Sequence, residues 1–350
     1  MASSKQVSFA NFICKFGDDR NMLDLAEEII LPAFLDCDSL NMRRFRETSY
    51  FFIQTELMNF GDAKNPQLAI AGRFVKDTTL RREQVYSPGK GIVKASGKLE
   101  SSPSALFVLV MNSHKLIYYP ETAHAPSLES FRSTAYSYIR QQQTIFINSE
   151  YERLQEARES MLELGGDVPD KTTKTQLWKE YSIPSLEVVP IPSELSLADF
   201  VKRYKRLSSI TLRVLQTNSE LDNSELLKSV RKTGSKLGAK NSQITHSAAE
   251  KEGLDQGEAV AQLKAVALDG NVDVKLSGVD AAGNKLVGNN DEFKLKVLVE
   301  NVSSQVGLAA AQLNAVLQEE VKGNNIKLGK DANLARTLEI IKRIARIKHV

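Results

Sequence analysis

The pattern of apolar and polar positions predicts a chain that mixes helices and strands. In the first half, helical spacing predicts helices over residues 21–31, 127–141 and 151–164, and aromatic and β-branched runs predict strands over 50–55 and 68–75. Residues 105–112 and 115–119 are typical of a hairpin around Asn112-Ser113-His114. The Ser, Gly and Lys content of 94–104 predicts a loop.

The second half shows the same mixture. Strands are predicted over residues 185–191 and 209–215, and helices over 196–204, 222–237, 255–268, 302–322 and 333–348. Alternating apolar residues over 272–276 and 293–299, on either side of a turn at 278–291, predict a β-meander. These elements indicate an α+β protein with a mixed N-terminal domain of antiparallel strands (1–166), a polar linker (167–184) and a basic α+β C-terminal domain (185–350).

Composition indicates an ordinary globular protein inside the cell. Hydrophobic residues make up 42% of the 350 and charged residues 25%. The only cysteines, Cys14 and Cys37, favour a reducing compartment, and each is expected to be buried and unpaired. Apolar runs such as 105–111 are far shorter than the roughly 20 residues of a membrane-spanning helix. The N-terminus lacks a secretory signal pattern, so we expect a cytoplasmic protein.

Charge divides unevenly along the chain. Residues 1–195 carry 22 Lys and Arg against 25 Asp and Glu, whereas residues 196–350 carry 24 against 18. Within the second part, residues 196–248 hold 10 basic and 4 acidic side chains. Such an asymmetry suggests a polyanionic partner for the second half.

Residue constellations for catalysis are not apparent. The four histidines, His114, His124, His246 and His349, lie in no motif that would supply a catalytic base, and each is expected at the surface or in a loop. The cysteines are 23 positions apart without the Cys and His spacing of a zinc site. Gly89-Lys90-Gly91 and residues 234–238 do not have the context of a phosphate-binding loop. We therefore expect no cofactor and no metal.

One alternative function remains open. A metal-dependent nuclease needs converging carboxylates and a Lys, and Asp291-Glu292-Phe293-Lys294 has those residue types without an identified upstream partner. A nuclease is thus the second hypothesis.

Basic side chains form three groups in the second half, and each could equally be a solvated helix face. The first surrounds Tyr204, the second follows helical spacing over 228–240, and the third lies on the last predicted helix. Their members are Lys202, Arg203, Lys205 and Arg206; Lys228, Arg231, Lys232, Lys236 and Lys240; and Lys342, Arg343 and Arg346. Clustered cations favour nucleic-acid backbones because each neutralised phosphate releases counterions. Without a zinc-finger or RNA-recognition motif, binding is expected to be backbone-driven and weakly sequence-specific.

The order of elements also resembles that of the phage-exclusion protein RexA and, more distantly, KwaB of the Kiwa anti-phage system. The segments that carry the resemblance are 49–55, 103–110, 115–119, 127–138, 186–190, 210–214, 224–234 and 272–299. Together they follow about two thirds of the chain without a diagnostic motif, while residues 87–102 and the tail after Lys322 have no counterpart. The resemblance implies a cytoplasmic, non-catalytic DNA binder that dimerises and acts with a membrane-protein partner in blocking phage growth.

From these observations we expect a binder of double-stranded DNA in an anti-phage exclusion system. We also expect a homodimer that forms through the apolar faces of the two terminal helices.

Overall fold

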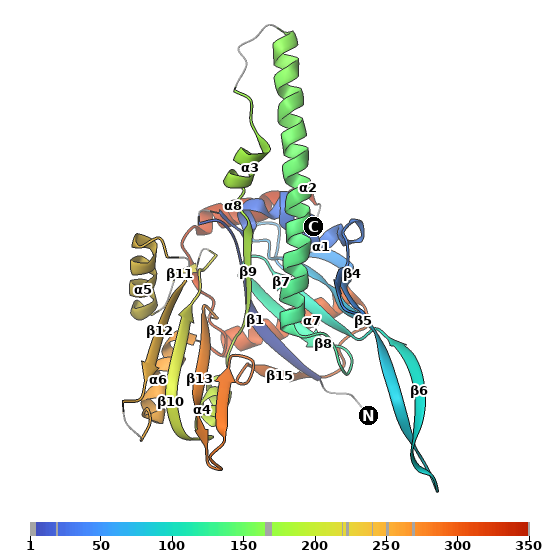
Figure 1. Cartoon of the computed structure of the whole chain (residues 1–350). Coiled ribbons are helices and arrows are strands. Elements are labelled where there is room, and N and C mark those ends of the chain that lie inside the picture. Colours follow the sequence, from blue (N-terminus) through green and yellow to red (C-terminus); the bar gives the residue numbers. More distant parts are fainter. Residues whose placement is uncertain are drawn as a thin grey trace.

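The computed structural model describes residues 5–18, 20–164, 170–218, 220–221, 224–239, 241–249, 252–267 and 270–348 (Figure 1). The protein is α+β, as the sequence predicts: its sheets are antiparallel, and helices pack against them.

The larger sheet contains ten strands of the described chain, with the central order β15-β1-β8-β7-β5-β4-β3. One edge of β1 is shared, because residues 5–8 pair with β15 and residues 10–16 pair with β9. The predicted hairpin 105–119 is confirmed as β7 and β8. The strands are β1 (Lys5–Phe16), β2 (Arg20–Asn21), β3 (Arg43–Phe45), β4 (Thr48–Asn59), β5 (Leu68–Ser87), β6 (Gly91–Ser101), β7 (Ser104–Val110), β8 (Lys115–Pro120), β9 (Pro184–Pro190) and β15 (Lys296–Val299).

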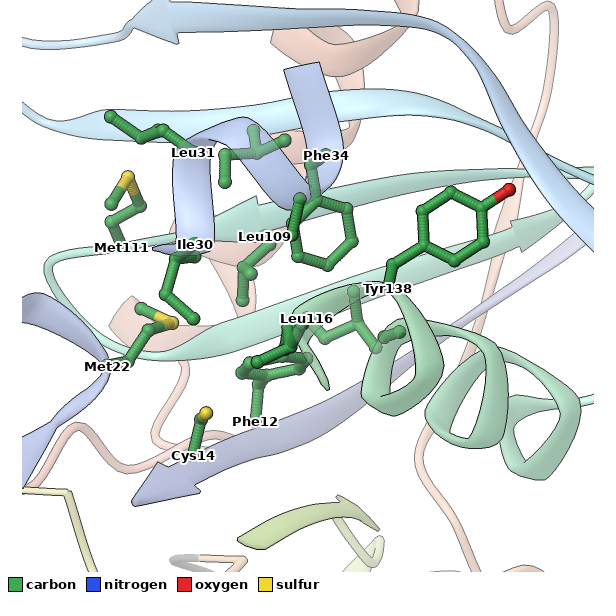
Figure 2. Close-up of a cluster of buried hydrophobic side chains, with 14 of the residues drawn as sticks. Phe12, Cys14, Met22, Ile30, Leu31, Phe34, Leu109, Met111, Leu116 and Tyr138 are labelled. Atoms are coloured by element: carbon green, nitrogen blue, oxygen red, sulfur yellow. The ribbon is translucent and has the colours of Figure 1, made fainter. Parts of the chain in front are cut away.

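Helices cover both faces of this sheet. On one face the apolar cluster of Figure 2 joins Phe12, Leu109 and Leu116 of the strands to Phe34 and Tyr138 of the helices. The helices of that face are η1 (Met22–Leu25), η2 (Ala26–Ile30), α1 (Leu31–Leu35), α2 (Leu128–Glu163) and α8 (Leu334–Ile347), and a short turn of helix, η3 (Cys37–Ser39), follows α1. On the opposite face, α7 (Val306–Lys322) packs against the strands.

The apolar faces of the terminal helices are occupied within the chain. α7 buries Ala309, Leu313 and Leu317 in the second cluster, and α8 buries Ile341 and Ile344 in the first. The expectation that these faces join two copies is therefore wrong for the buried residues, because their partners are the chain's own strands and helices.

A single long helix replaces two predicted ones. α2 runs for 36 residues, about 54 Å at the rise of an α-helix, and begins at the N-cap Ser127. Residues 142–150, which the sequence pattern had left between the helices, contain neither Pro nor Gly, and Ile147 continues the buried face. The last turns of α2 project from the body, with α3 (Lys174–Glu180) beside the helix (Figure 1).

The smaller sheet has the order β12-β10-β13-β14. Its strands are β10 (Tyr204–Val214), β12 (Ser242–Ser247), β13 (Val272–Asp280) and β14 (Lys285–Asn289), and its core includes residues of α4 (Glu194–Val201), α5 (Glu225–Lys236) and α6 (Gln256–Ala267). The predicted meander is only half right. β14, not the segment 293–299, pairs with β13, and β15 crosses to β1 of the larger sheet.

The two sheets are not divided at the expected linker. β9, β15 and α7 all begin at or after residue 184, yet they complete the larger sheet and cover it. Arg213 of β10 binds across the junction to Glu187 of β9 at 3.0 Å, and within the small sheet to Asp273 of β13 at 3.3 Å. The boundary at 167–184 thus separates elements that share one sheet.

The expected loop 94–104 is instead mostly strand. β6 pairs with the outer part of β5, from Thr78↔Ser101 to Ser87↔Gly91, and this two-stranded arm extends away from the body (Figure 1). Pairing with β5 provides hydrogen-bond partners for the backbone N–H and C=O groups of this segment, although its composition favours a loop.

Candidate nucleic-acid interface

The first basic group lies where α4 turns into β10. Tyr204 is buried in the core of the small sheet, and the four cations around it are exposed because they point away from that core. Lys202 pairs with Asp199 at 3.1 Å, and the guanidinium of Arg203 lies 4.9 Å from the ring centre of Phe200. Lys205 and Arg206 extend the group along the start of β10.

The second group follows α5. Leu227 anchors this helix in the small-sheet core, while Lys232 and Lys236 are exposed. Lys228 is 2.6 Å from Glu225, one turn earlier, and Arg231 is half-buried. Residues 234–238 form the end of α5 rather than a phosphate loop, with Gly238 in the left-handed region at φ +64°. Lys240 lies outside the described residues.

The third group lies on α8, on another part of the molecule. Arg343 pairs with Glu27 of η2 at 2.7 Å, and Arg336 pairs with Asp24 of η1 at 2.6 Å. These two arginines therefore hold α8 against the acidic N-terminal helices. Of the other two cations of this group, Arg346 is exposed and Lys342 is half-buried, and neither forms a salt bridge with another described residue.

The structure does not merge the three groups into one patch. The first group lies at the beginning of β10, whereas Gly234 of the second group lies against Ser242, which pairs with Val214 at the end of β10. β10 is about 35 Å long, and α5 lies beside its second half, because Leu226 at the start of this helix lines a pocket with Ile210 and Leu212. The α8 group belongs to the larger sheet's side.

A buried polar joint ties the segment before α5 to the larger sheet. The short strand β11 (Glu220–Leu221), which pairs with β16 (Lys330–Asp331), precedes α5. Just before it, the Asn218 amide accepts from the Cys14 N–H at 3.0 Å and donates to the Phe12 carbonyl at 3.0 Å. Glu220 itself lies 2.8 Å from the imidazole of His114.

Charges in this joint compensate each other. Burial on its own would raise the pKa of Glu220, but the hydrogen bond and charge of His114, with Lys115 nearby, hold it well below its usual range. Lys115 is itself buried and donates to Asn11 at 3.2 Å. The expectation of a surface position is wrong for His114: it lies in the β7–β8 turn but is 1% exposed.

The arm carries a basic group that the sequence analysis missed. Residues 78–99 contain Arg81, Arg82, Lys90, Lys94 and Lys98 against a single acidic residue, Glu83. All five cations are exposed, and Arg81 also pairs with Glu47 at the root of the arm. Averaging the charge over the first 195 residues concealed this group, which a count in a 20-residue window would have found.

The nuclease residues do not converge on a metal site. Asp291 is 3.0 Å from Lys294, an i,i+3 pair at the surface. Among the described residues, no three His, Cys, Asp or Glu side chains are grouped as metal ligands would be. Both cysteines are buried and free, as the sequence predicts.

One apolar pocket, of about 410 Å³, opens over the small sheet between α5 and α6. The floor of the pocket is formed by the strand residues Ile210, Leu212 and Ile244, and its polar atoms come from His246, Asp255 and Glu258. The carboxylate of Asp255 accepts a hydrogen bond from the Glu258 N–H at 2.8 Å, so it caps the N-terminus of α6.

Comparison of the chain with protein-family models and with curated proteins gives no match in either case. None of the described helices is both long and apolar enough to cross a membrane.

Proposed function

We propose that this is a cytoplasmic protein that binds double-stranded DNA through backbone contacts, with little sequence specificity, as part of an anti-phage exclusion system. The observation that carries the proposal is the pair of basic groups at the two ends of β10. β10 is about 35 Å long, close to one turn of B-form DNA, so Lys205 at its start and Lys236 of α5 near its end could contact phosphates one turn apart.

The exposed cations of these groups, such as Lys205, Lys232 and Lys236, are available to phosphates. Exposed i,i+3 pairs such as Lys202–Asp199 and Lys228–Glu225 contribute at most about 1 kcal/mol each, and so they exchange readily for a phosphate partner. Backbone contacts of this kind carry no base information, which accounts for the low specificity that we propose.

The biological setting of the proposal follows the resemblance to the phage-exclusion proteins. It includes a homodimer and a membrane-protein partner of the same defence system. Because the apolar faces of α7 and α8 are occupied, the second copy would have to use another surface.

Charge reversal tests the proposal. Lys232→Glu/Lys236→Glu and Lys202→Glu/Lys205→Glu change exposed side chains on α5 and at the α4–β10 turn. Fluorescence anisotropy with a random 30-base-pair duplex should show each pair weakening binding by about tenfold or more at moderate salt. The matched control is Lys322→Glu/Lys327→Glu, an equal charge change at exposed positions near the end of α7, which should bind as the parent does.

Two results would oppose the proposal. If both reversal variants bind DNA like the parent, the basic groups are solvated faces. If the parent itself binds no duplex, its partner is not DNA. Incubation of DNA with Mg²⁺ or Mn²⁺ in the same assay tests the nuclease alternative, since cleavage that is lost on mutation of Asp291 or Glu292 would favour it.

A further inference from the structure

The β5–β6 arm is an isolated two-stranded hairpin. β5 pairs with β7 as far as Val75 and with β4 as far as Asp77, and from Thr78 outward it pairs with β6 alone. Figure 1 shows the arm extending well away from the rest of the chain. Two-stranded hairpins are marginally stable by themselves in water, so a long one that projects in this way is suited to lie against a partner.

The strand register sorts the arm's side chains onto two faces. One face carries two apolar cross-strand pairs, Leu80↔Leu99 near the root and Tyr86↔Ile92 near the tip. Arg82 and Lys94 lie between these pairs on the same face. The four apolar side chains are 47–74% exposed, and they form a row with cations between them.

The tip is narrow and apolar. Tyr86 is 74% exposed and Ile92 68%, directly behind the turn Ser87-Pro88-Gly89-Lys90-Gly91. Gly89 and Gly91 have φ of +79° and +72°, a left-handed conformation that lets the chain reverse within a few residues. The arm therefore ends in Tyr86, Pro88 and Ile92, with Lys90 beside them.

The net charge of the arm favours a polyanion over a second copy of the chain as its partner. With Glu100 included, residues 78–101 hold five cations against two carboxylates, a net charge of +3. Two such arms would repel each other face to face, whereas a polyanion is attracted along the whole length of the arm. Bare apolar packing with a second copy would also leave Arg82 and Lys94 between the two apolar faces without compensation.

We infer that the β5–β6 arm lies in a groove of duplex DNA, with its Lys and Arg side chains on the phosphates and its apolar tip wedged against a base step. This inference rests on the proposed function, because it takes DNA as the partner. It adds a contact surface on the larger sheet, separate from the basic groups of α5 and β10.

The consequence of such a wedge is a bent duplex. Apolar side chains that enter the minor groove partly unstack a base step and kink the DNA, while neighbouring cations neutralise the phosphates on either side. Tyr86, Pro88 and Ile92 have the size and exposure for the first role, and Lys90, Lys94 and Lys98 have the charge for the second.

DNA bending tests the tip. With dyes at both ends of a 30-base-pair duplex and the protein at saturation, the parent should raise the energy transfer between the dyes, and Tyr86→Ser/Ile92→Ser should lose most of that rise. The matched control is Leu80→Ser/Leu99→Ser, which removes the apolar pair at the root and should retain it. If both variants lose the rise equally, or if neither does, the wedge is wrong.

Affinity tests the cations. Lys90→Gln/Lys94→Gln/Lys98→Gln should weaken duplex binding by about tenfold or more and make log K less dependent on log salt by up to about 0.9 per lost contact. Lys322→Gln/Lys327→Gln is the control of the same kind, at exposed positions at and after the end of α7. All these residues are exposed, so circular dichroism should show every variant folded like the parent.

The inference and the proposed function fail in different ways. If the parent protein binds no DNA, both the proposed function and the inference about the arm are wrong. Suppose that the parent protein binds DNA and that charge reversal on α5 weakens this binding. If the arm variants then bind and bend DNA as the parent does, only the inference about the arm is wrong. Sedimentation without DNA tests whether the arm instead binds a second copy of the chain. If Tyr86→Ser/Ile92→Ser converts a dimer to a monomer, the tip contacts that second copy and the assignment to DNA is overturned.

Discussion

The Nδ1 atom of His114 lies 2.8 Å from Oε1 of Glu220, although the two residues are 106 positions apart. Both side chains are buried, at 1% and 7% exposure. His114 reaches this position from the β7–β8 turn with φ of +54°, a left-handed conformation unusual for a side chain other than Gly. The pair ties the hairpin of the larger sheet to the strand that leads into α5, so it couples the candidate DNA-binding helix to the main core.

This pair predicts a specific loss of stability in acid. Because the pKa of Glu220 is depressed in the folded protein, its contribution is fully present above the unfolded value of about 4.5 and is lost as pH falls toward 2. Glu220→Gln should therefore be less stable than the parent by about 3 kcal/mol at pH 7, with the gap narrowing below pH about 4. Urea unfolding at several pH values measures this. The exposed Glu319→Gln is the control and should follow the parent; a Glu220→Gln gap that stays constant with pH would contradict the account.

The aromatic core should be sensitive to loss of Phe52. Its ring centre lies 5.2–5.5 Å from those of Phe34, Phe74, Phe107, Phe131 and Tyr138. Phe52→Ala leaves a cavity among these rings and should lower the free energy of unfolding by about 3–5 kcal/mol. Phe45→Ala, at a ring that is 56% exposed, should change it by less than about 0.5 kcal/mol. Equal effects of the two substitutions in urea titrations would argue against this core.

Gly288 should not tolerate a side chain. A Cβ at this position of β14 would lie 2.1 Å from Cε1 of Phe200, the α4 ring against which Arg203 lies. Gly288→Ala should therefore force Phe200 to move and destabilise the protein by about 1–3 kcal/mol, seen as a lower Tm. At Gly323, where a Cβ would meet its nearest atom at 3.4 Å, the same substitution should leave Tm nearly unchanged. An unchanged Tm for Gly288→Ala would show that α4 packs differently.

The thiols should be inert in the folded protein. Burial raises the pKa of Cys14 to about 12, and burial also raises that of Cys37. Since the thiolate is the reactive form, a thiol reagent at pH about 8 should label neither residue quickly in native protein and both in denaturant. Rapid labelling of one thiol under native conditions would contradict its burial.

DNA binding, if it is backbone-driven, should depend steeply on salt. The logarithm of the affinity should fall by about 0.9 per phosphate contact against the logarithm of the salt concentration. Duplexes of random and chosen sequence should bind within about tenfold of each other. Anisotropy titrations across a salt series measure both quantities, and a flat response would exclude phosphate contacts as the source of affinity.

Local sequence patterns determined most of the helices and strands. The hairpin 105–119 and the terminal helices α7 and α8 follow directly from apolar spacing, because one face of each element is buried and the period of the pattern records which face. The buried cysteines and the exposure of most candidate cations were likewise predictable from residue type.

Only the tertiary structure decided which segments meet. The alternation at 293–299 marks a strand but cannot say that Val297 pairs with Val7 instead of with β13, because either edge would bury the same face. The arm is strand only because β5 pairs with 91–101, and since both of its faces mix apolar with charged side chains, the sequence shows no regular alternation there. The joint of His114 and Glu220, and the separation of the basic groups, depend on contacts between residues that lie far apart in the chain. The local spacing of apolar residues shows which face of an element is buried, whereas the packing of the whole chain decides which element covers that face.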